Sequence, residues 1–332
     1  KVIRKDNFFR IVKVGEKMLI AKDRQGNLIN LLESHPGKGQ YFCPTCCSAV
    51  RLKAGRIMRR HFAHISLKNC QFYHENESNE HLQLKAKLYM SLSRENETML
   101  EHHLPEINQI ADLFVNEALA LEVQCSRLSE QRLRERTKAY LQADFQVRWL
   151  LGEKLWLKHR LTNLHKQFLQ FSQSIGFHIW ELDLRLEVLR LKYLIYEDLR
   201  GHVYYLSKTC PLSGDVLAFL KWPYQSKNLN FYKVKQDRNI RDYVRQQLRY
   251  GNQFWLRKQE KAYLSGQNLL TQELMMFFPQ IQPPRVDTDF CQITNSLTSF
   301  YQNFTNYYQK NKNNLDQTLY PPVFYDKIVT KN

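Results

Sequence analysis

Residues 109–124 read QIADLFVNEALALEVQ, and this stretch decides the class of fold. Two apolar segments, Gln109–Val115 and Leu119–Val123, flank a short break, which predicts two β-strands joined as a hairpin. With the turn centred on residue 117, residue 112 lies directly opposite residue 122. The register of this hairpin therefore determines which side chains meet across it.

Asp112 and Glu122 are the acids of this hairpin, and each is embedded in an otherwise apolar strand. Burying a lone carboxylate is costly, and opposed residues of an antiparallel pair have Cβ atoms about 5 Å apart. A divalent cation bound through both carboxylates would offset that cost. Without a cation, we expect repulsion to raise the pKa of one acid. The alternative is that both acids belong to a salt-bridged strand pair.

The segments around the hairpin extend it to a mixed α/β domain. They predict two amphipathic helices, at Ser78–Leu92 and Glu130–Tyr140, and strands at Met99–His103 and Gln146–Leu150. The order is helix, three strands, helix and strand. A further strand pair, His178–Tyr196 and His202–Leu206, turns about residues 198–201 and could extend the same sheet.

Asp112, nine residues, then Glu122-x-Gln124 matches the nuclease signature Asp…(Asp/Glu)-x-Lys, with glutamine at the lysine position. In such nucleases, carboxylates hold Mg²⁺ or Mn²⁺, which activates water and neutralises charge on the scissile phosphate. Gln124 can hydrogen-bond but carries no positive charge. A third carboxylate, Glu80, lies in the first turn of the preceding helix. The predicted catalytic residues are Glu80, Asp112, Glu122 and Gln124, with Asp112 and Glu122 as the cation ligands.

Arg136 and Tyr140 lie four residues apart on the helix that follows the hairpin, so they share one face. They are candidates for contact with DNA phosphates. A solvated helix face explains the same spacing equally well.

Cys43-Pro44-Thr45-Cys46 is a CxxC knuckle, whose two thiolates can share one tetrahedral zinc ion. Cys70 and one histidine of His61-Phe62-Ala63-His64 are expected to complete the site. Alternation along an extended segment sends the two histidines to opposite faces, so only one of them reaches the metal. The favoured zinc ligands are Cys43, Cys46, His64 and Cys70, with His61 as the alternate. The alternative is a small core of reduced cysteines, without metal.

Lysine and arginine total 49 against 32 acidic residues, a formal net charge of +17, which favours a polyanionic partner such as DNA. A merely soluble or ribosome-associated basic protein would share this composition. We expect no secretory signal and no bilayer-spanning segment, and we place the protein in the cytoplasm. Residues 221–263 hold eleven Lys/Arg, three Asp/Glu and nine aromatic residues, a mixture that suits single strands. A basic helical face with its rings in the core is the competing interpretation.

Taken together, these motifs resemble the CoiA family, the competence proteins of naturally transformable Gram-positive bacteria. The resemblance covers residues 18–152 well and the rest loosely. It rests on Tyr41-Phe42-Cys43-Pro44-x-Cys46, His61-Phe62-Ala63-His64, Ser78-Asn79-Glu80-His81 leading to Lys85, Ala111-Asp112, Glu122-Val123-Gln124-Cys125-Ser126 and Arg136-Thr137-x-x-Tyr140. The doubled Cys46-Cys47 departs from the family pattern, and Gln124 departs from the wider nuclease superfamily.

The resemblance implies a role in transformation, when incoming single-stranded DNA recombines with the chromosome. It also implies that Asp112, Glu122 and Gln124 fall on the nuclease motif and Glu80 on the helix-borne acid. Family chains begin near Met18, which would make residues 1–17 an extension.

The predicted fold is an α/β restriction-endonuclease-like (PD-(D/E)xK) core, with a small N-terminal zinc-binding domain and a mainly α-helical C-terminal domain. The predicted limits are residues 18–75 for the zinc-finger-like domain, 76–210 for the nuclease-like domain and 211–332 for the basic helical domain. The predicted function is cleavage of single-stranded or branched DNA with Mg²⁺ or Mn²⁺, beside a structural Zn²⁺. The rival prediction is a non-catalytic DNA-binding adaptor that assists a strand-exchange recombinase.

Overall fold

The computed structural model describes residues 17–55, 59–66, 70, 77–225, 230–286, 289–312 and 315–329. The protein is a mixed α/β protein, as the order of segments predicts. It divides into two compact units. One holds the described residues up to Cys125 together with 143–148, and the other holds 126–142 and the described residues from Trp149 onward. Across the described ranges, no helix combines the length and hydrophobicity that a bilayer crossing requires.

The first unit begins with a small antiparallel sheet. Its strand order is β1-β6-β5-β4-β2-β3. Phe62 is fully buried in the small core of this sheet, beside Met18 and Tyr41. The strands are β1 (Lys17–Met18), β2 (Ile20–Lys22), β3 (Leu28–Asn30), β4 (Tyr41–Phe42), β5 (Ala49–Lys53) and β6 (His61–His64).

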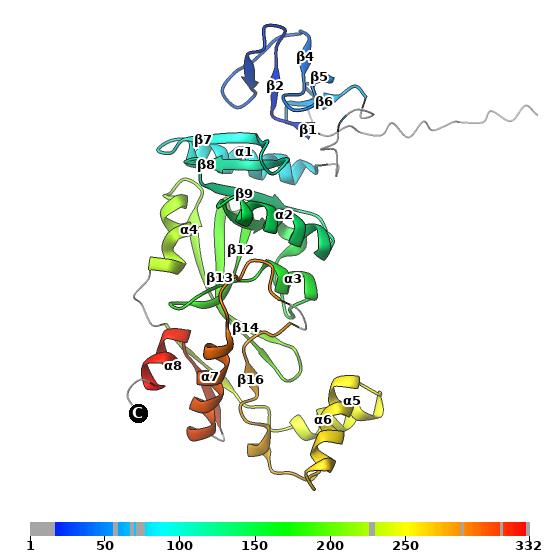
Figure 1. The fold of residues 1–332 in the computed structure, drawn as a ribbon, viewed down its shortest axis with the longest axis vertical. Helices are drawn as coiled ribbons and strands as arrows, with labels where there is room; N and C mark the ends of the chain where they lie inside the picture. The colour runs from blue at the N-terminus through cyan, green and yellow to red at the C-terminus, as the bar shows by residue number, and fades with distance from the viewer. Residues whose placement is uncertain are drawn as a thin grey trace, which may run out of the picture. The chain divides into compact units, whose positions relative to one another are not determined.

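Helix α1 (Asn79–Leu92) follows in the same unit and lies against three antiparallel strands (Figure 1). The Ser78 hydroxyl caps it by accepting a hydrogen bond from the His81 amide, 3.1 Å away, because the first helical N–H groups lack partners inside the helix. The strands are β7 (Thr98–Leu104), β8 (Gln109–Val115) and β9 (Leu119–Gln124). Asn116 and Glu117 both have left-handed backbones, with φ of 49° and 51°, which closes the predicted tight turn between β8 and β9.

In the second unit, the predicted helix is α2 (Glu130–Gln142), and the sheet is mixed. The end of β10 (Gln146–Leu151) pairs in parallel with β12 (Gly176–Asp183). Antiparallel partners continue the sheet through β13 (Val188–Asp198) and β14 (Val203–Pro211). The hairpin about residues 198–201 is therefore confirmed.

The prediction of one strand over His178–Tyr196 is wrong. The Asp183 carboxylate accepts hydrogen bonds from the amides of Arg185 and Leu186, each at 3.0 Å, and bends the chain between β12 and β13. A short side chain that bonds to backbone two or three residues ahead is an alternative to the strand ladder.

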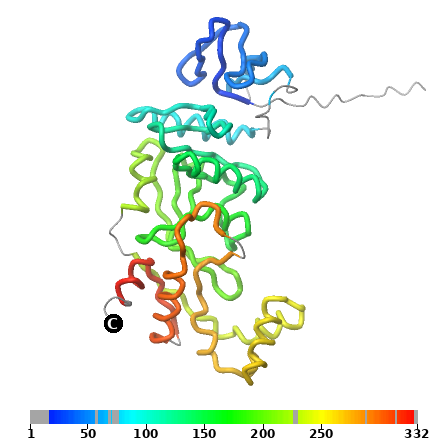
Figure 2. The backbone as a smooth tube through the Cα atoms, viewed as in Figure 1, coloured from blue at the N-terminus to red at the C-terminus, as the bar shows by residue number. Residues whose placement is uncertain are grey.

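The rest of the second unit is rich in helices, as expected, but also contains short strands that the sequence did not predict. Helices α7 and α8 pack together near the C-terminal end (Figure 2). The remaining elements are η1 (Glu153–Leu155), α3 (Asn163–Phe168), β11 (Gln170–Ser172), α4 (Val216–Gln225), β15 (Tyr232–Lys235), α5 (Ile240–Arg249), α6 (Gln253–Leu264), η2 (Leu274–Phe277), β16 (Ile281–Gln282), α7 (Thr298–Lys310), β17 (Asp316–Leu319) and α8 (Pro322–Val329).

Candidate functional site

The Cys/His cluster lies in the N-terminal sheet of the first unit. It consists of Cys43, Cys46, His64 and Cys70, whose ligand atoms all lie within 4.8 Å of one another. These are the four residues that the sequence favoured. Cys43 and Cys46 stand at either end of the turn that follows β4, and His64 ends β6.

Two neighbouring residues fall outside the Cys/His cluster. Cys47 is exposed and has a left-handed backbone, with φ of 57°, so it does not join its neighbour Cys46. His61 lies on β6 with its Nδ1 2.8 Å from the Arg59 carbonyl oxygen. Of the two histidines, His64 is thus the one that the fold places with the cysteines, with its Nε2 3.3 Å from the Cys46 Sγ.

The donor set of the Cys/His cluster fits zinc. Three sulfurs and one imidazole nitrogen match the number and type of ligands that a tetrahedral zinc ion takes, and none of the described cysteines is in a disulfide. Burial raises the pKa of the Cys43 thiol to about 12. A cation would reverse this shift, because a coordinating thiol loses its proton to the metal. An ion held by all four residues would have no open ligand position, which is typical of structural zinc sites.

A second group of ligand atoms lies at the start of α1 and on β8. Glu77, His81 and Asp112 also place their ligand atoms within 4.8 Å of one another. We call this group the acidic cluster. Their side chains are 13%, 17% and 14% exposed respectively, so each is reached by solvent.

The register predicted for the hairpin is confirmed. The pairs Leu113–Leu121, Phe114–Ala120 and Val115–Leu119 make Asp112 the residue opposite Glu122. On the other side of β8, the pairs of β7 place Glu101 opposite Asp112. By register, acidic residues of three adjacent strands therefore fall at neighbouring positions.

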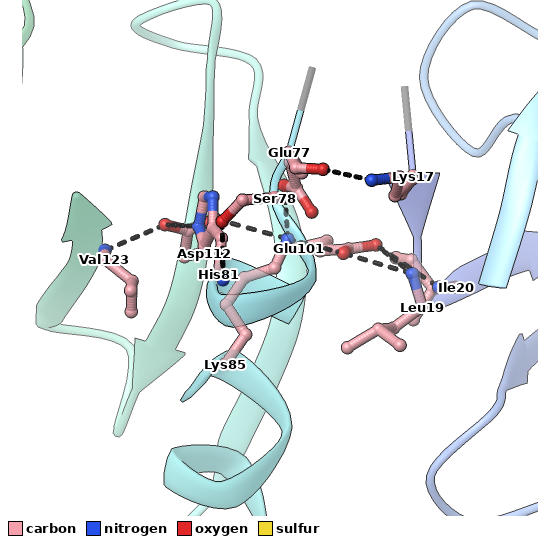
Figure 3. Close-up of polar contacts among 10 residues, drawn as sticks. All are labelled: Lys17, Leu19, Ile20, Glu77, Ser78, His81, Lys85, Glu101, Asp112 and Val123. Carbon is pink, nitrogen blue, oxygen red and sulfur yellow. Dashed lines mark hydrogen bonds and ion pairs between the residues drawn. The ribbon is translucent and has the colours of Figure 1, made fainter. Parts of the chain in front are cut away.

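A buried lysine balances the charge of these acids, as Figure 3 shows. The Lys85 Nζ lies 2.7 Å from Glu101, 2.6 Å from Glu77 and 3.4 Å from Asp112, and its side chain is 1% exposed. Lys85 comes from α1, one turn after His81. Burial alone would lower the pKa of Lys85, but the three carboxylates raise it well above its ordinary value, so Lys85 is charged.

Three donors surround the Asp112 carboxylate: the His81 ring, the Val123 amide and the Lys85 ammonium group. His81 Nε2 lies 3.1 Å from its Oδ2, and the Val123 amide donates to the same oxygen at 2.8 Å. Burial works against ionisation, yet the charges of His81 and Lys85 hold the pKa of Asp112 below its usual range. These cations outweigh any repulsion at Asp112, so Asp112 is not the hairpin acid whose pKa is raised.

Glu101 connects the acidic cluster to the N-terminal sheet (Figure 3). Its carboxylate accepts hydrogen bonds from the Leu19 amide at 2.9 Å and the Ile20 amide at 3.2 Å, while it also pairs with Lys85. Its backbone is left-handed, with φ of 48°, which is rare for a residue with a side chain. Such a conformation persists only where surrounding contacts hold it, and these bonds do so.

The other predicted catalytic residues lie nearby but outside the acidic cluster. Glu122 and Gln124 are buried on β9, at 2% and 7% exposure. Glu80 is half-buried in the first turn of α1. Burial raises the pKa of the Cys125 thiol, and the negative charges of Glu80, Asp112 and Glu77 raise it further. Glu80 therefore lies close enough to Cys125 to act on it together with two members of the acidic cluster.

The predicted DNA contacts on α2 belong to the second unit. Tyr140 is completely buried, which removes it as a surface contact for phosphate. Arg136 is half-buried, and its guanidinium lies 5.2 Å from the centre of the Trp149 ring. The shared face of these residues therefore packs against the unit.

Glu77, His81, Lys85 and Glu101 were not predicted as site residues. His81 and Lys85 lie four residues apart on α1, the spacing that aligns side chains along one helix face, and Glu77 lies four residues before His81, just ahead of the Ser78 cap. The turn at residues 105–108 fixes the opposition of Glu101 and Asp112, just as the later turn fixes that of Asp112 and Glu122. The sequence thus contained a signal for each, in spacing rather than in a motif.

Comparisons with known proteins identify the family to which the chain belongs. The family description "Competence protein CoiA, nuclease-like domain" matches residues 77–213, and "Competence protein CoiA, N-terminal domain" matches residues 27–73. The chain is also 30% identical over 142 residues to "Competence protein CoiA" of Bacillus subtilis (strain 168). That similarity covers 40% of this chain and 38% of the relative's length. No solved structure matches the chain.

Proposed function

Because the chain belongs to the CoiA family of competence proteins, we propose that it cleaves DNA during transformation as a metal-dependent phosphodiesterase of the PD-(D/E)xK kind. The proposed substrates are single-stranded or branched recombination intermediates, and the proposed partner is a strand-exchange recombinase. One observation carries the proposal. A solvent-reached group of metal-ligating atoms, the acidic cluster, lies within the residues that match the nuclease-like domain.

The acidic cluster fits a divalent cation by the chemistry of its donors. Two carboxylates and one imidazole lie close enough to share an ion. Mg²⁺ prefers oxygen ligands in near-ideal octahedral geometry, whereas imidazole suits transition metals, so the set favours Mn²⁺. When bound, the ion would supply an activated water and neutralise charge on the phosphate. Glu122, at the neighbouring register position on β9, would be the next carboxylate available to such an ion.

Lys85 offers the positive charge that Gln124 lacks. The usual lysine of this nuclease class follows the second acid on its strand, and here that position is glutamine. Lys85 reaches Asp112 from α1 instead, at 3.4 Å. It holds Asp112 ionised, and Glu101 and Glu77 fix its position. Gln124 would keep the ability to orient water by hydrogen bonding.

The rival function, a non-catalytic DNA-binding adaptor, also has an observation in its favour. Lys85 and His81 already compensate Asp112, so the acidic cluster is stable without a metal ion. A degenerate nuclease would keep this ion-pair network for stability alone. The two proposals therefore differ in whether a cation enters the acidic cluster.

The test is incubation of labelled single-stranded, duplex and branched DNA with the wild-type protein and Mn²⁺ or Mg²⁺. We expect cleavage with Mn²⁺, and loss of that cleavage in Asp112→Asn with DNA binding retained. Asp242→Asn is the matched control, because Asp242 is an exposed acid of α5 that pairs with Arg245. DNA binding by the wild type without cleavage under any of these conditions would favour the adaptor.

A further inference from the structure

The second unit contains a hollow of about 430 Å³, a volume in the range of small-ligand sites, roughly 300–1,000 Å³. It is lined by the start of β14, by β15 and by the segment before α3. The Val203 amide donates to the His159 carbonyl oxygen at 3.0 Å and joins two of these segments. The hollow is thus built from parts of the chain that are distant in sequence.

Basic side chains surround this hollow. Lys158, His159, Lys233 and Lys235 all line it, and all are exposed. Among the residues that the structure describes, none of these four forms an ion pair. Asp316 lies opposite Lys235 in the β15–β17 ladder. Even with this acid counted, the rim is positive, and it can accept an anion without first breaking an ion pair.

Three tyrosines, Tyr204, Tyr205 and Tyr232, are among the residues that line the hollow. The Tyr232 hydroxyl donates to the Leu194 carbonyl oxygen at 2.8 Å, and the Tyr204 hydroxyl donates to the Asp198 carboxylate at 3.3 Å. These bonds hold the two rings in place. The Tyr205 ring has Lys192 on it, 4.9 Å from the ring centre. Fixed rings beside free cations match the way single strands bind, since bases stack on rings while cations follow the phosphates.

We propose that this hollow binds a nucleotide unit of single-stranded DNA, with Lys158, Lys233 and Lys235 toward phosphate and a tyrosine against the base. The proposal rests on the proposed action on DNA for its choice of ligand, but not on cleavage. It also limits the broader prediction for residues 221–263. Of the described residues in that basic segment, Tyr232 to Lys235 line the hollow.

The experiment measures binding of a labelled fifteen-nucleotide oligo(dT) to the full-length protein by fluorescence anisotropy, over a range of salt concentrations. Replacing Lys233 and Lys235 together by alanine should weaken binding at least about tenfold at low salt. It should also reduce the slope of log affinity against log salt by about 1.4, since each phosphate contact on a single strand contributes about 0.7. Both lysines are exposed, so the variant should fold normally.

The matched control removes the same charge elsewhere in the basic segment. Arg257→Ala with Lys261→Ala changes two exposed residues of α6, which do not line the hollow, and should leave affinity within about twofold of wild type. An equal loss in both double variants would mean that binding is delocalised, and it would overturn the proposal. Unchanged binding in the Lys233/Lys235 variant would overturn it as well.

Tyr205 tests the stacking separately. Tyr205→Phe keeps the ring and should bind like the wild type, whereas Tyr205→Leu should bind at least about fivefold more weakly, since stacking contributes about 1–3 kcal/mol per base. Competition by dTMP distinguishes a free nucleotide from a strand. If dTMP displaces the oligonucleotide at equal concentration, the site is one for free nucleotides. Asp112→Asn, which should not cleave, must still bind through this hollow, so failure of the nuclease proposal would not remove this one.

Discussion

The Cys/His cluster and the acidic cluster lie in the same unit, and both bring their ligand atoms within 4.8 Å, yet they balance charge differently. The Cys/His cluster has no cationic side chain among its members, and burial raises the pKa of its Cys43 thiol. The acidic cluster has its own cation in Lys85. We propose that a metal ion supplies the missing positive charge of the first. The second is balanced without one, so an ion there must compete with an existing ion pair.

The largest expected effect is removal of the zinc ion that we propose for the Cys/His cluster. Cys43→Ser should unfold the N-terminal sheet, because structural zinc contributes about 10–16 kcal/mol in small zinc domains and this sheet has a small core. Elemental analysis and thermal melts of chelator-treated protein would measure it. Cys47→Ser, outside the cluster, should keep both zinc and stability. If the metal-free protein kept an intact N-terminal sheet, the Cys/His cluster would not depend on a metal ion, and the proposed difference between the two clusters would fail.

Replacement of Lys85 by methionine should have the next largest effect. It leaves Glu101, Glu77 and Asp112 without their shared cation, and breaking a buried pair costs about 3–5 kcal/mol. Urea unfolding would measure the change in the free energy of unfolding. Lys87→Met, on the same helix but outside the network, is the control. If both variants lose the same small amount, Lys85 does not balance the acids.

Asp112→Asn should destabilise the metal-free protein by about 2 kcal/mol, because hydrogen bonds to charged groups contribute about 1.5–3 kcal/mol. The variant loses the charge that faces His81 and Lys85 but keeps the shape of the side chain. Thermal melts in buffer without manganese or magnesium would measure it against Asp242→Asn. A variant that is as stable as the wild type, or more stable, would restore the idea that repulsion dominates at Asp112.

The smallest effect is expected at Glu80, which marks the edge of the acidic cluster. Glu80→Gln removes a negative charge from the first turn of α1, which costs about 0.3–1 kcal/mol through the helix dipole. Affinity for Mn²⁺ should change little, and calorimetric titration would measure it. A loss of Mn²⁺ binding as large as that caused by Asp112→Asn would place Glu80 among the ligands.

Much of the fold around the site was predictable, because local signals determine it. The turn at Asn116 and Glu117 fixes the β8–β9 register, and the cap at Ser78 fixes where α1 begins. The CxxC knuckle and strand alternation were enough to gather the Cys/His cluster. In contrast, the strand break after Asp183 depends on one side chain bonding to nearby backbone amides, which the apolar pattern does not reveal.

The charge balance of the acidic cluster was not predictable in the same way. A lysine within a helix is usually solvated, and Lys85 is buried only because α1 packs on the strands that carry Glu101 and Asp112. Tyr140 illustrates the converse error, since spacing placed it on a face but did not say that the face is buried. Partners across a tertiary contact decide both cases.

Electron paramagnetic resonance of Mn²⁺ added to the zinc-loaded protein tests the central claim most directly, because it reports whether a cation enters the acidic cluster. We predict that each wild-type chain binds one Mn²⁺ and that Asp112→Asn binds none at the same Mn²⁺ concentration. Asp242→Asn should bind like the wild type. His81→Asn should weaken the binding, since it removes the imidazole donor. Binding that is absent in the wild type, or unchanged in Asp112→Asn, would contradict the account.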